Sequence, residues 1–347
     1  MLMATQSPAT VVAVTAIMLT CDVFVVSLRF LARRQRRQPL QADDWLCFAS
    51  LILSFGLSIT LFIGVAQRAL AYSTPTSTAL LPRTALEMSN DKIIIVSRIQ
   101  YIFLVISVPT LGFIKASVLF FYRRIFVVDK TNLRNVQNLL YISMLTIVGI
   151  WAMGFMFSFM FACKGNFVAW WTSAISLIEN CVNTLELFFA FAVSDFIFDC
   201  VIIITPIPMI WNLHLPTAKK LGVLLIFLLG ILATVASLIR MIWVIWARAV
   251  GFDVSLDQNL LITTSLFWNM LEISISIVAS CLPVLRGLVR KQTMDSWVHS
   301  IRDMLSLHGE QLSDESVDSA KLSSSKSEVP SNELHVVTVT VERVREY

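Results

Sequence analysis

The chain is poor in charge. Only 14% of its 347 residues are Asp, Glu, Lys or Arg, whereas 56% are hydrophobic, and soluble domains usually carry about 25% charged residues. Its mean hydropathy is +0.75. So little charge excludes the surface of an ordinary soluble enzyme and the basic face that nucleic-acid binding requires. We therefore expect an integral membrane protein with the lipid bilayer as its surroundings and no nucleic-acid partner.

Histidine is scarce as well. The chain has four, at positions 214, 299, 308 and 335, and none lies in an apolar run. This excludes haem ligation, histidine-box di-iron chemistry and histidine-based zinc sites within the membrane. The sequence predicts no metal site. It also has no Cys-x-x-Cys spacing and no Asn-x-Ser/Thr sequon, so N-glycosylation is not expected.

Seven apolar stretches are each long enough to cross a bilayer, which takes about 20 residues. They cover roughly residues 9–31, 45–66, 93–121, 138–162, 186–211, 219–247 and 259–285. The first lacks a basic segment and a cleavage site, so we expect a retained helix and not a signal peptide. The fold class predicted is all-α: a polytopic seven-transmembrane helix bundle over residues 9–290, after a short external segment 1–8. The plasma membrane is favoured, with an endomembrane as the alternative.

Basic residues collect on one side of these stretches. With the N-terminus outside, the inside loops hold 13 Lys and Arg and the outside loops 5, which favours an N-out, C-in orientation. The inside loops are marked by six arginines: Arg33, Arg34, Arg36, Arg37, Arg123 and Arg124. Such residues set topology, and binding of anionic lipid head groups is a further role.

The cysteines agree with this orientation. Cys163 ends the fourth stretch and Cys181 precedes the fifth, so both fall on the predicted outer side, where disulfides persist. A disulfide closing this loop is expected, and two unpaired thiols are the alternative. The other four cysteines lie in apolar runs and are interpreted as small packing residues: Cys21, Cys47, Cys200 and Cys281.

Ionisable residues inside the spans are costly and mark candidate sites. Away from the ends of the stretches, seven are candidates: Asp22, Arg29, Lys115, Asp195, Asp199, Arg240 and Glu272. Asp195 and Asp199 are four residues apart and share one helix face, with Lys115 and Arg240 available to pair with them. The network of Lys115, Asp195, Asp199, Arg240 and Glu272 has three interpretations: a structural ion-pair network, a polar cavity that recognises a ligand or changes state, and a proton relay or acid catalyst.

The last 57 residues hold 16 of the 50 charged residues. Residues 294–308 carry an apolar stripe that predicts an amphipathic helix on the inner membrane face, with a short soluble helix as the alternative. Residues 309–347 are rich in serine and charge and are expected to be mostly disordered, with sites for phosphorylation. The segment 291–347 is therefore a predicted cytoplasmic tail that can reach a signalling partner.

Several motifs resemble the fungal rhodopsin-like seven-transmembrane family, which includes pathogenicity-type receptor-like proteins and a satratoxin-cluster membrane protein. The matching pieces are Ala42-Asp43-Asp44-Trp45, residues 115–126, Cys163 and Cys181, Ser194-Asp195 with Pro206-Ile207-Pro208 and Trp211, residues 213–220, Ser237-Leu238-Ile239-Arg240, Glu272, and residues 281–286. Each motif is short, but their order and spacing together cover about residues 10–290.

The chain also departs from rhodopsins and animal receptors. Residues 260–285 contain no lysine, so a retinal Schiff base cannot form there and no cofactor is expected. Tyr122-Arg123-Arg124 stands where animal-type receptors have an acidic-Arg-aromatic triplet, so coupling to a G protein is an analogy.

The sequence leaves three functions open. The first is a non-catalytic, receptor-like membrane protein that senses a small or lipophilic ligand or serves as an accessory protein of a fungal secondary-metabolite (mycotoxin) pathway. The second is an integral-membrane enzyme such as a terpene cyclase, with a buried carboxylate as its acid. The third is a transporter of a hydrophobic metabolite, which lacks support because the seven spans do not divide into inverted halves.

Overall fold

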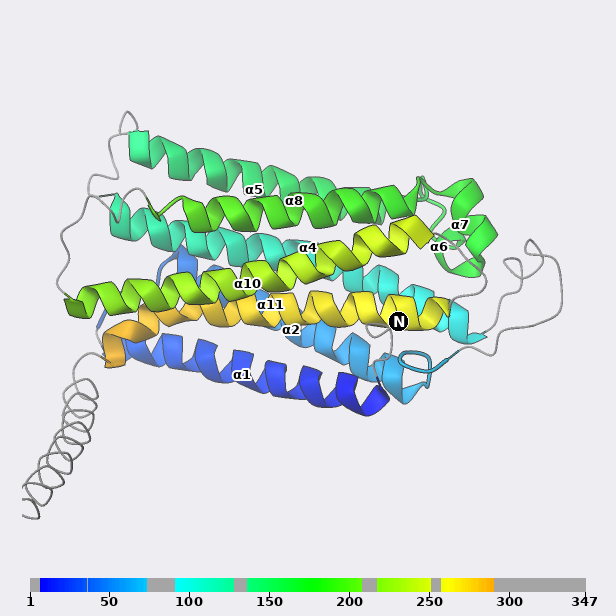
Figure 1. Cartoon of the computed structure of the whole chain (residues 1–347), viewed down its shortest axis with the longest axis horizontal. Coiled ribbons are helices and arrows are strands. Elements are labelled where there is room, and N and C mark those ends of the chain that lie inside the picture. The colour runs from blue at the N-terminus through cyan, green and yellow to red at the C-terminus, as the bar shows by residue number, and fades with distance from the viewer. Residues whose placement is uncertain are drawn as a thin grey trace, which may run out of the picture. The chain divides into compact units, whose positions relative to one another are not determined.

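The computed structural model describes residues 7–35, 37–73, 91–127, 136–207, 217–250 and 257–289. Seven long helices run side by side along the bundle (Figure 1). They are α1 (Pro8–Gln35), α2 (Ala42–Ala66), α4 (Asp91–Phe126), α5 (Val136–Met160), α8 (Thr184–Ile204), α10 (Thr217–Val250) and α11 (Gln258–Val289). Each contains an apolar stretch long enough to span a membrane. The all-helical, seven-span fold predicted from the sequence is confirmed.

The helices differ from the predicted stretches mainly at their ends. Most extend several residues further, because polar and basic residues in a terminal turn lower the hydropathy without breaking the helix. The fifth is shorter: α8 ends at Ile204 instead of near residue 211, where Pro206 lacks the backbone N–H that a helix interior needs. The amphipathic helix at 294–308, the tail 309–347, Arg36 and Trp211 lie outside the described residues.

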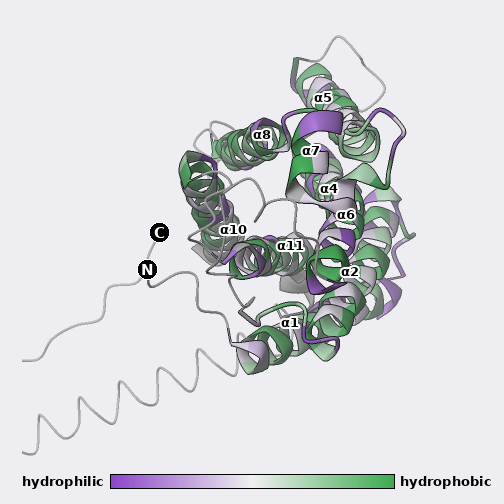
Figure 2. Ribbon diagram, turned by 90° about the vertical axis from the view of Figure 1, so that its right-hand side faces the viewer, coloured by the Kyte–Doolittle hydropathy of each residue, from purple (hydrophilic) through white to green (hydrophobic). Residues whose placement is uncertain are grey.

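The outer faces of the bundle are apolar. Large hydrophobic side chains are exposed on α1, α2, α4, α5, α8 and α10, among them Phe24 (63% exposed) and Ile150 (69%). Hydrophobic colouring predominates on the helix ribbons in Figure 2. A soluble protein would bury such residues, whereas lipid tails accept them. The helices α4 and α11 are the inner ones, with 61% and 56% of their apolar windows buried.

The helix α4 packs closely along both α2 and α5. At Gly112, an added Cβ would lie 2.7 Å from the Cβ of Ala152 on α5, so glycine is required for this approach. Apolar residues of α11 belong to the main core of the bundle. Polar contacts also join α11 to its neighbours, beginning near its first turn, where the Thr263 hydroxyl accepts a hydrogen bond of 3.0 Å from the backbone N–H of Ala71.

Two short helices, α6 (Ala169–Thr172) and α7 (Ala174–Asn180), lie between α5 and α8 at one end of the bundle (Figure 1). Cys163 and Cys181 form a disulfide across this segment, which confirms the predicted pair. The sequence did not predict the two helices. We call this the disulfide end. At the opposite end, called the basic end, α1 and α4 finish in turns that contain Arg33, Arg34, Arg123 and Arg124.

Candidate functional site

Five charged side chains, four of them buried and one partly buried, meet between α4, α8, α10 and α11. We call them the central network: Lys115, Asp195, Asp199, Arg240 and Glu272. They are the five residues that the sequence singled out as a polar group within the spans. In the chain they lie up to 157 positions apart, so only the folded bundle brings them together.

The carboxylates of α8 bind the one ammonium group of the network. Asp195 and Asp199 lie one helical turn apart, as their spacing predicts, and both form ion pairs with Lys115 of α4. The Lys115 Nζ lies 3.3 Å from Asp195 Oδ1. The Asp195 side chain is fully buried, whereas that of Asp199 keeps 14% exposure. Asp199 is therefore the more accessible of the two carboxylates.

Arg240 of α10 links Asp195 of α8 to Glu272 of α11. Its Nη2 lies 2.7 Å from Asp195 Oδ2, and its Nε lies 2.7 Å from Glu272 Oε2. The guanidinium carbon is also 4.9 Å from the ring centre of Phe191, within the range of a cation–π contact. A single cation thus joins three helices, and its planar, always-charged group suits that geometry.

The charges of the central network do not balance. Two cations face three carboxylates, which leaves one negative charge when all five groups are ionised. Burying an uncompensated charge is costly, so a proton or another positive group must supply the difference. Carboxylate oxygens of Asp195, Asp199 and Glu272 lie within 4.8 Å of one another, close enough to share a cation, but Lys115 and Arg240 already bind them.

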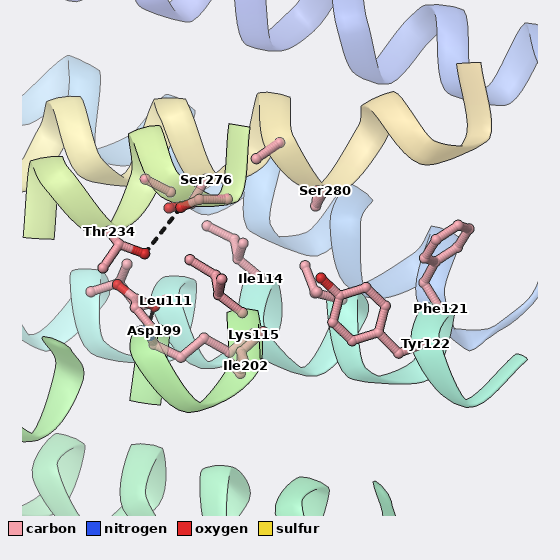
Figure 3. Close-up of a pocket in the computed structure, with 15 residues that line it drawn as sticks. Leu111, Ile114, Lys115, Phe121, Tyr122, Asp199, Ile202, Thr234, Ser276 and Ser280 are labelled. Carbon is pink, nitrogen blue, oxygen red and sulfur yellow. Dashed lines mark hydrogen bonds and ion pairs between the residues drawn. The ribbon is translucent and has the colours of Figure 1, made fainter. Parts of the chain in front are cut away.

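A cavity of about 70 Å³ adjoins the network between α4, α8, α10 and α11 (Figure 3). Lys115 and Asp199 form its charged wall. The rest of the wall is mostly apolar, with hydroxyls at Tyr122, Thr234, Ser276 and Ser280. The apolar lining residues are Leu111, Ile114, Val118, Phe121, Ile202, Ile203, Gly230, Ala233 and Ala279. An apolar pocket with a few convergent polar groups is the usual form of a small-molecule site.

A second buried cluster, which we call the charge cage, lies at the basic end. It comprises Arg29 and Arg33 of α1 with Asp43 and Asp44 of α2. The Arg29 Nη2 lies 2.7 Å from Asp43 Oδ2, and its Nε lies 2.8 Å from Asp44 Oδ1. The Arg33 Nη2 lies 2.8 Å from the same Asp43 oxygen. Two cations here meet two anions. This cluster is not among the sequence predictions, because low hydropathy places Arg33 in a loop and the two aspartates stand in a family motif.

The sequence did contain a signal for the charge cage. Arg29 and Arg33 are four residues apart at the end of one helix, and the adjacent aspartates open the next helix after a short connection. The cage also contacts both inner helices. Arg29 donates a 2.7 Å hydrogen bond to the Ser280 carbonyl of α11, and the Ser117 hydroxyl of α4 donates a 2.8 Å hydrogen bond to the Asp43 carbonyl.

The remaining predicted residues are distributed over the bundle. Asp22 is buried on α1 and accepts a 3.3 Å hydrogen bond from Ser54 of α2, apart from the central network. Arg123 donates a 2.9 Å hydrogen bond to Asn138. Arg34 is exposed in the last turn of α1. Of the arginines assigned to basic loops, Arg33 thus proves to be a buried helix residue.

The sequence has a curated relative in the fungus Metarhizium anisopliae, named polyenoic acids biosynthesis gene cluster protein Ba17b. The two are 26% identical over 290 residues, which cover 80% of this chain and 72% of the relative. No solved structure shows a significant match to the chain.

A family model matches the greater part of the bundle. The fungal rhodopsin domain model covers residues 28–291, which include the charge cage, the disulfide and all five residues of the central network. It agrees with the seven-helix architecture and with the motifs quoted from the sequence. The chain therefore belongs to the fungal rhodopsin domain family.

Proposed function

We propose that the protein is a non-catalytic, receptor-like or accessory membrane protein that binds a small lipophilic ligand in the cavity beside the central network. The observation that carries this proposal is the cavity itself, an apolar space whose charged wall is Lys115 and Asp199. Its volume accommodates the polar end of a ligand, and the remaining apolar part of the molecule would lie between helices.

The named relative supports a metabolic setting. Because that protein is assigned to a polyenoic acid biosynthesis gene cluster, we place the present chain beside a fungal secondary-metabolite pathway with a lipophilic product. The protein would act in the plasma membrane or an endomembrane. Its cytoplasmic contact would be made through the basic end and the tail.

The charge balance restricts the polar end of the ligand. Both cations of the central network are already bound by carboxylates, and the network carries one carboxylate in excess. An anionic head group would add to that excess. The proposed ligand therefore has a neutral hydroxyl or a cationic amine at its polar end and is not bound as a carboxylate.

The residues do not fit a retinal Schiff base of the kind found in light-driven rhodopsins. Such a bond needs a lysine on the seventh helix, and α11 contains none. Lys115 is the buried lysine beside the cavity, and its ammonium group is held by two carboxylates. We therefore propose that the ligand is held by non-covalent contacts.

The test uses fluorescent conjugated C18 polyenes with three head groups: an acid, the corresponding alcohol and the corresponding amine. Fluorescence is titrated against the full-length protein in lipid nanodiscs, with empty nanodiscs subtracted. We expect the alcohol or amine to bind at least tenfold more tightly than the acid. Failure of all three polyenes to bind would overturn the proposed function, and preference for the acid would overturn the head-group assignment.

A matched pair of variants locates the binding. Ala233 on α10 lines the cavity, and Ala249 on the same helix is exposed. Replacement of Ala233 by Leu fills the cavity and should weaken binding at least tenfold. Replacement of Ala249 by Leu adds the same volume elsewhere and should leave binding unchanged. Equal effects of the two variants would show that the polyene binds outside this cavity.

A further inference from the structure

Two buried cysteines meet near the basic end of the bundle. The Sγ atoms of Cys47 on α2 and Cys281 on α11 are 3.3 Å apart. Both residues are almost fully buried, with 1% and 0% exposure. They stand 234 positions apart in the sequence, so the packing of α2 against α11 creates the contact. The sequence treated each of them as an isolated packing residue, and the structure makes them a pair.

The surroundings of the pair are polar. The Ser280 hydroxyl lies 3.7 Å from Cys47 Sγ and 3.9 Å from Cys281 Sγ. The Arg29 guanidinium binds the Ser280 carbonyl at 2.7 Å, which places a positive charge one residue away from Cys281. A nearby guanidinium stabilises the negative charge on a sulfur that attacks an electrophile. A packing role for the two thiols does not require such neighbours.

We propose that Cys47 and Cys281 are a modification site, at which a lipid hydroperoxide converts the two thiols into a disulfide between α2 and α11. The location of the pair argues for this oxidant class. Both sulfurs are shielded from water inside the spans, and an apolar hydroperoxide partitions into the bilayer. Ser280 also lines the cavity, so the pair adjoins a mostly apolar space, and entry of a lipophilic molecule there rests on the proposed function.

The reaction consumes one hydroperoxide. One cysteine sulfur attacks the terminal peroxide oxygen and the O–O bond breaks. The thiol proton passes to the leaving alkoxide, so the products are a cysteine sulfenic acid and the lipid alcohol. The second thiol then attacks the sulfenic sulfur, the S–S bond forms, and the hydroxyl leaves as water with the thiol proton. The two thiols lose two electrons and the hydroperoxide gains them. The sulfurs need to approach from 3.3 Å to about 2.05 Å.

The experiment counts free thiols in the full-length protein in lipid nanodiscs. Four cysteines are free in the structure, Cys21, Cys47, Cys200 and Cys281. After treatment with cumene hydroperoxide, the protein is denatured and labelled with a maleimide polymer that shifts its mobility once per thiol. We expect the number of labels to fall from four to two, and mass spectrometry to find the Cys47 peptide joined to the Cys281 peptide.

The variants separate the pair from the other thiols. Cys47→Ser and Cys281→Ser should each lose at most one of their three labels, because a sulfenic acid without its second thiol forms no disulfide, whereas Cys21→Ser and Cys200→Ser should each fall from three to one. Four labels in treated wild-type protein, or a loss without the joined peptide, would overturn the proposal. An equal response to hydrogen peroxide would overturn the assignment of a lipid oxidant. Because the joined peptide is sought in the wild-type protein, a variant that fails to fold does not affect that result. Nor does the site depend on which ligand the cavity binds.

Discussion

The charge cage and the central network are both buried clusters of ionised side chains, yet they differ in balance and in access. The cage has two arginines and two aspartates, and none of the four lines the cavity. The network has two cations and three carboxylates, and two of its members, Lys115 and Asp199, form the cavity wall.

This difference separates a structural role from the proposed ligand-binding one. A balanced cluster with short contacts compensates its own charges and gains nothing from a ligand. An unbalanced cluster beside a cavity can bind a proton or a polar ligand, because its own partners leave one charge uncompensated. The family motif at Asp43 and Asp44 thus explains how α1 and α2 are held, whereas the site for a ligand is sought around Asp199.

The largest effect is expected for Arg240→Met. Loss of this guanidinium leaves Lys115 as the one cation among three carboxylates, so the excess rises from one to two negative charges. We expect the free energy of unfolding to fall by about 5 kcal/mol. Unfolding in SDS, followed by tryptophan fluorescence, measures the change. A loss below about 2 kcal/mol would mean that the network is open to water.

A smaller effect is expected for Arg29→Met in the charge cage. Arg33 still binds both aspartates, but Asp43 and Asp44 lose their closer partner and Ser280 loses a donor. The expected cost is about 3 kcal/mol. Arg34→Met is the control, since Arg34 is exposed in the last turn of the same helix and should change stability by less than about 0.5 kcal/mol. Similar losses in both variants would argue against a structural cage.

The two clusters should respond in different ways when one aspartate is neutralised. Asp199→Asn brings the central network to two charges of each sign, so the stability should change by less than about 1 kcal/mol, while polyene binding is lost. Asp43→Asn unbalances the cage and should cost about 2–3 kcal/mol without a direct effect on binding. If Asp199→Asn proves as costly as Asp43→Asn, charge balance is not what distinguishes the clusters.

An exposed ion pair provides the baseline. Near the disulfide end, the Arg248 Nη2 lies 2.6 Å from Glu186 Oε1, and the two side chains are 42% and 48% exposed. Arg248→Gln should reduce the free energy of unfolding by about 0.2–1 kcal/mol, and higher salt should reduce that difference further. An effect as large as that of Arg29→Met would show that burial is not the source of the larger values.

The sequence predicted the fold well because hydropathy reports directly on membrane spans. All seven helices, the Cys163–Cys181 disulfide and the common face of Asp195 and Asp199 followed from local patterns. Helix ends were less accurate, since a turn that contains Arg33 and Arg34 looks like a loop by hydropathy although helical hydrogen bonds continue through it.

Contacts between distant helices could not be predicted from one sequence. Nothing local indicates that Asp22 lies apart from the central network or that Cys47 meets Cys281. These facts depend on the rotation of each helix about its axis. The sequence did name the five residues of the network, because ionisable groups are rare enough within spans to be noticed one by one.

The polar contacts of α11 have a mechanical consequence. They occur at several depths of the bundle, at Thr263, Asn269, Glu272 and Ser280. Because a helix moves as a rigid element, a shift at one of these contacts changes the geometry of the others. The helix α11 therefore provides a continuous element through which a displacement at one membrane face would reach the other.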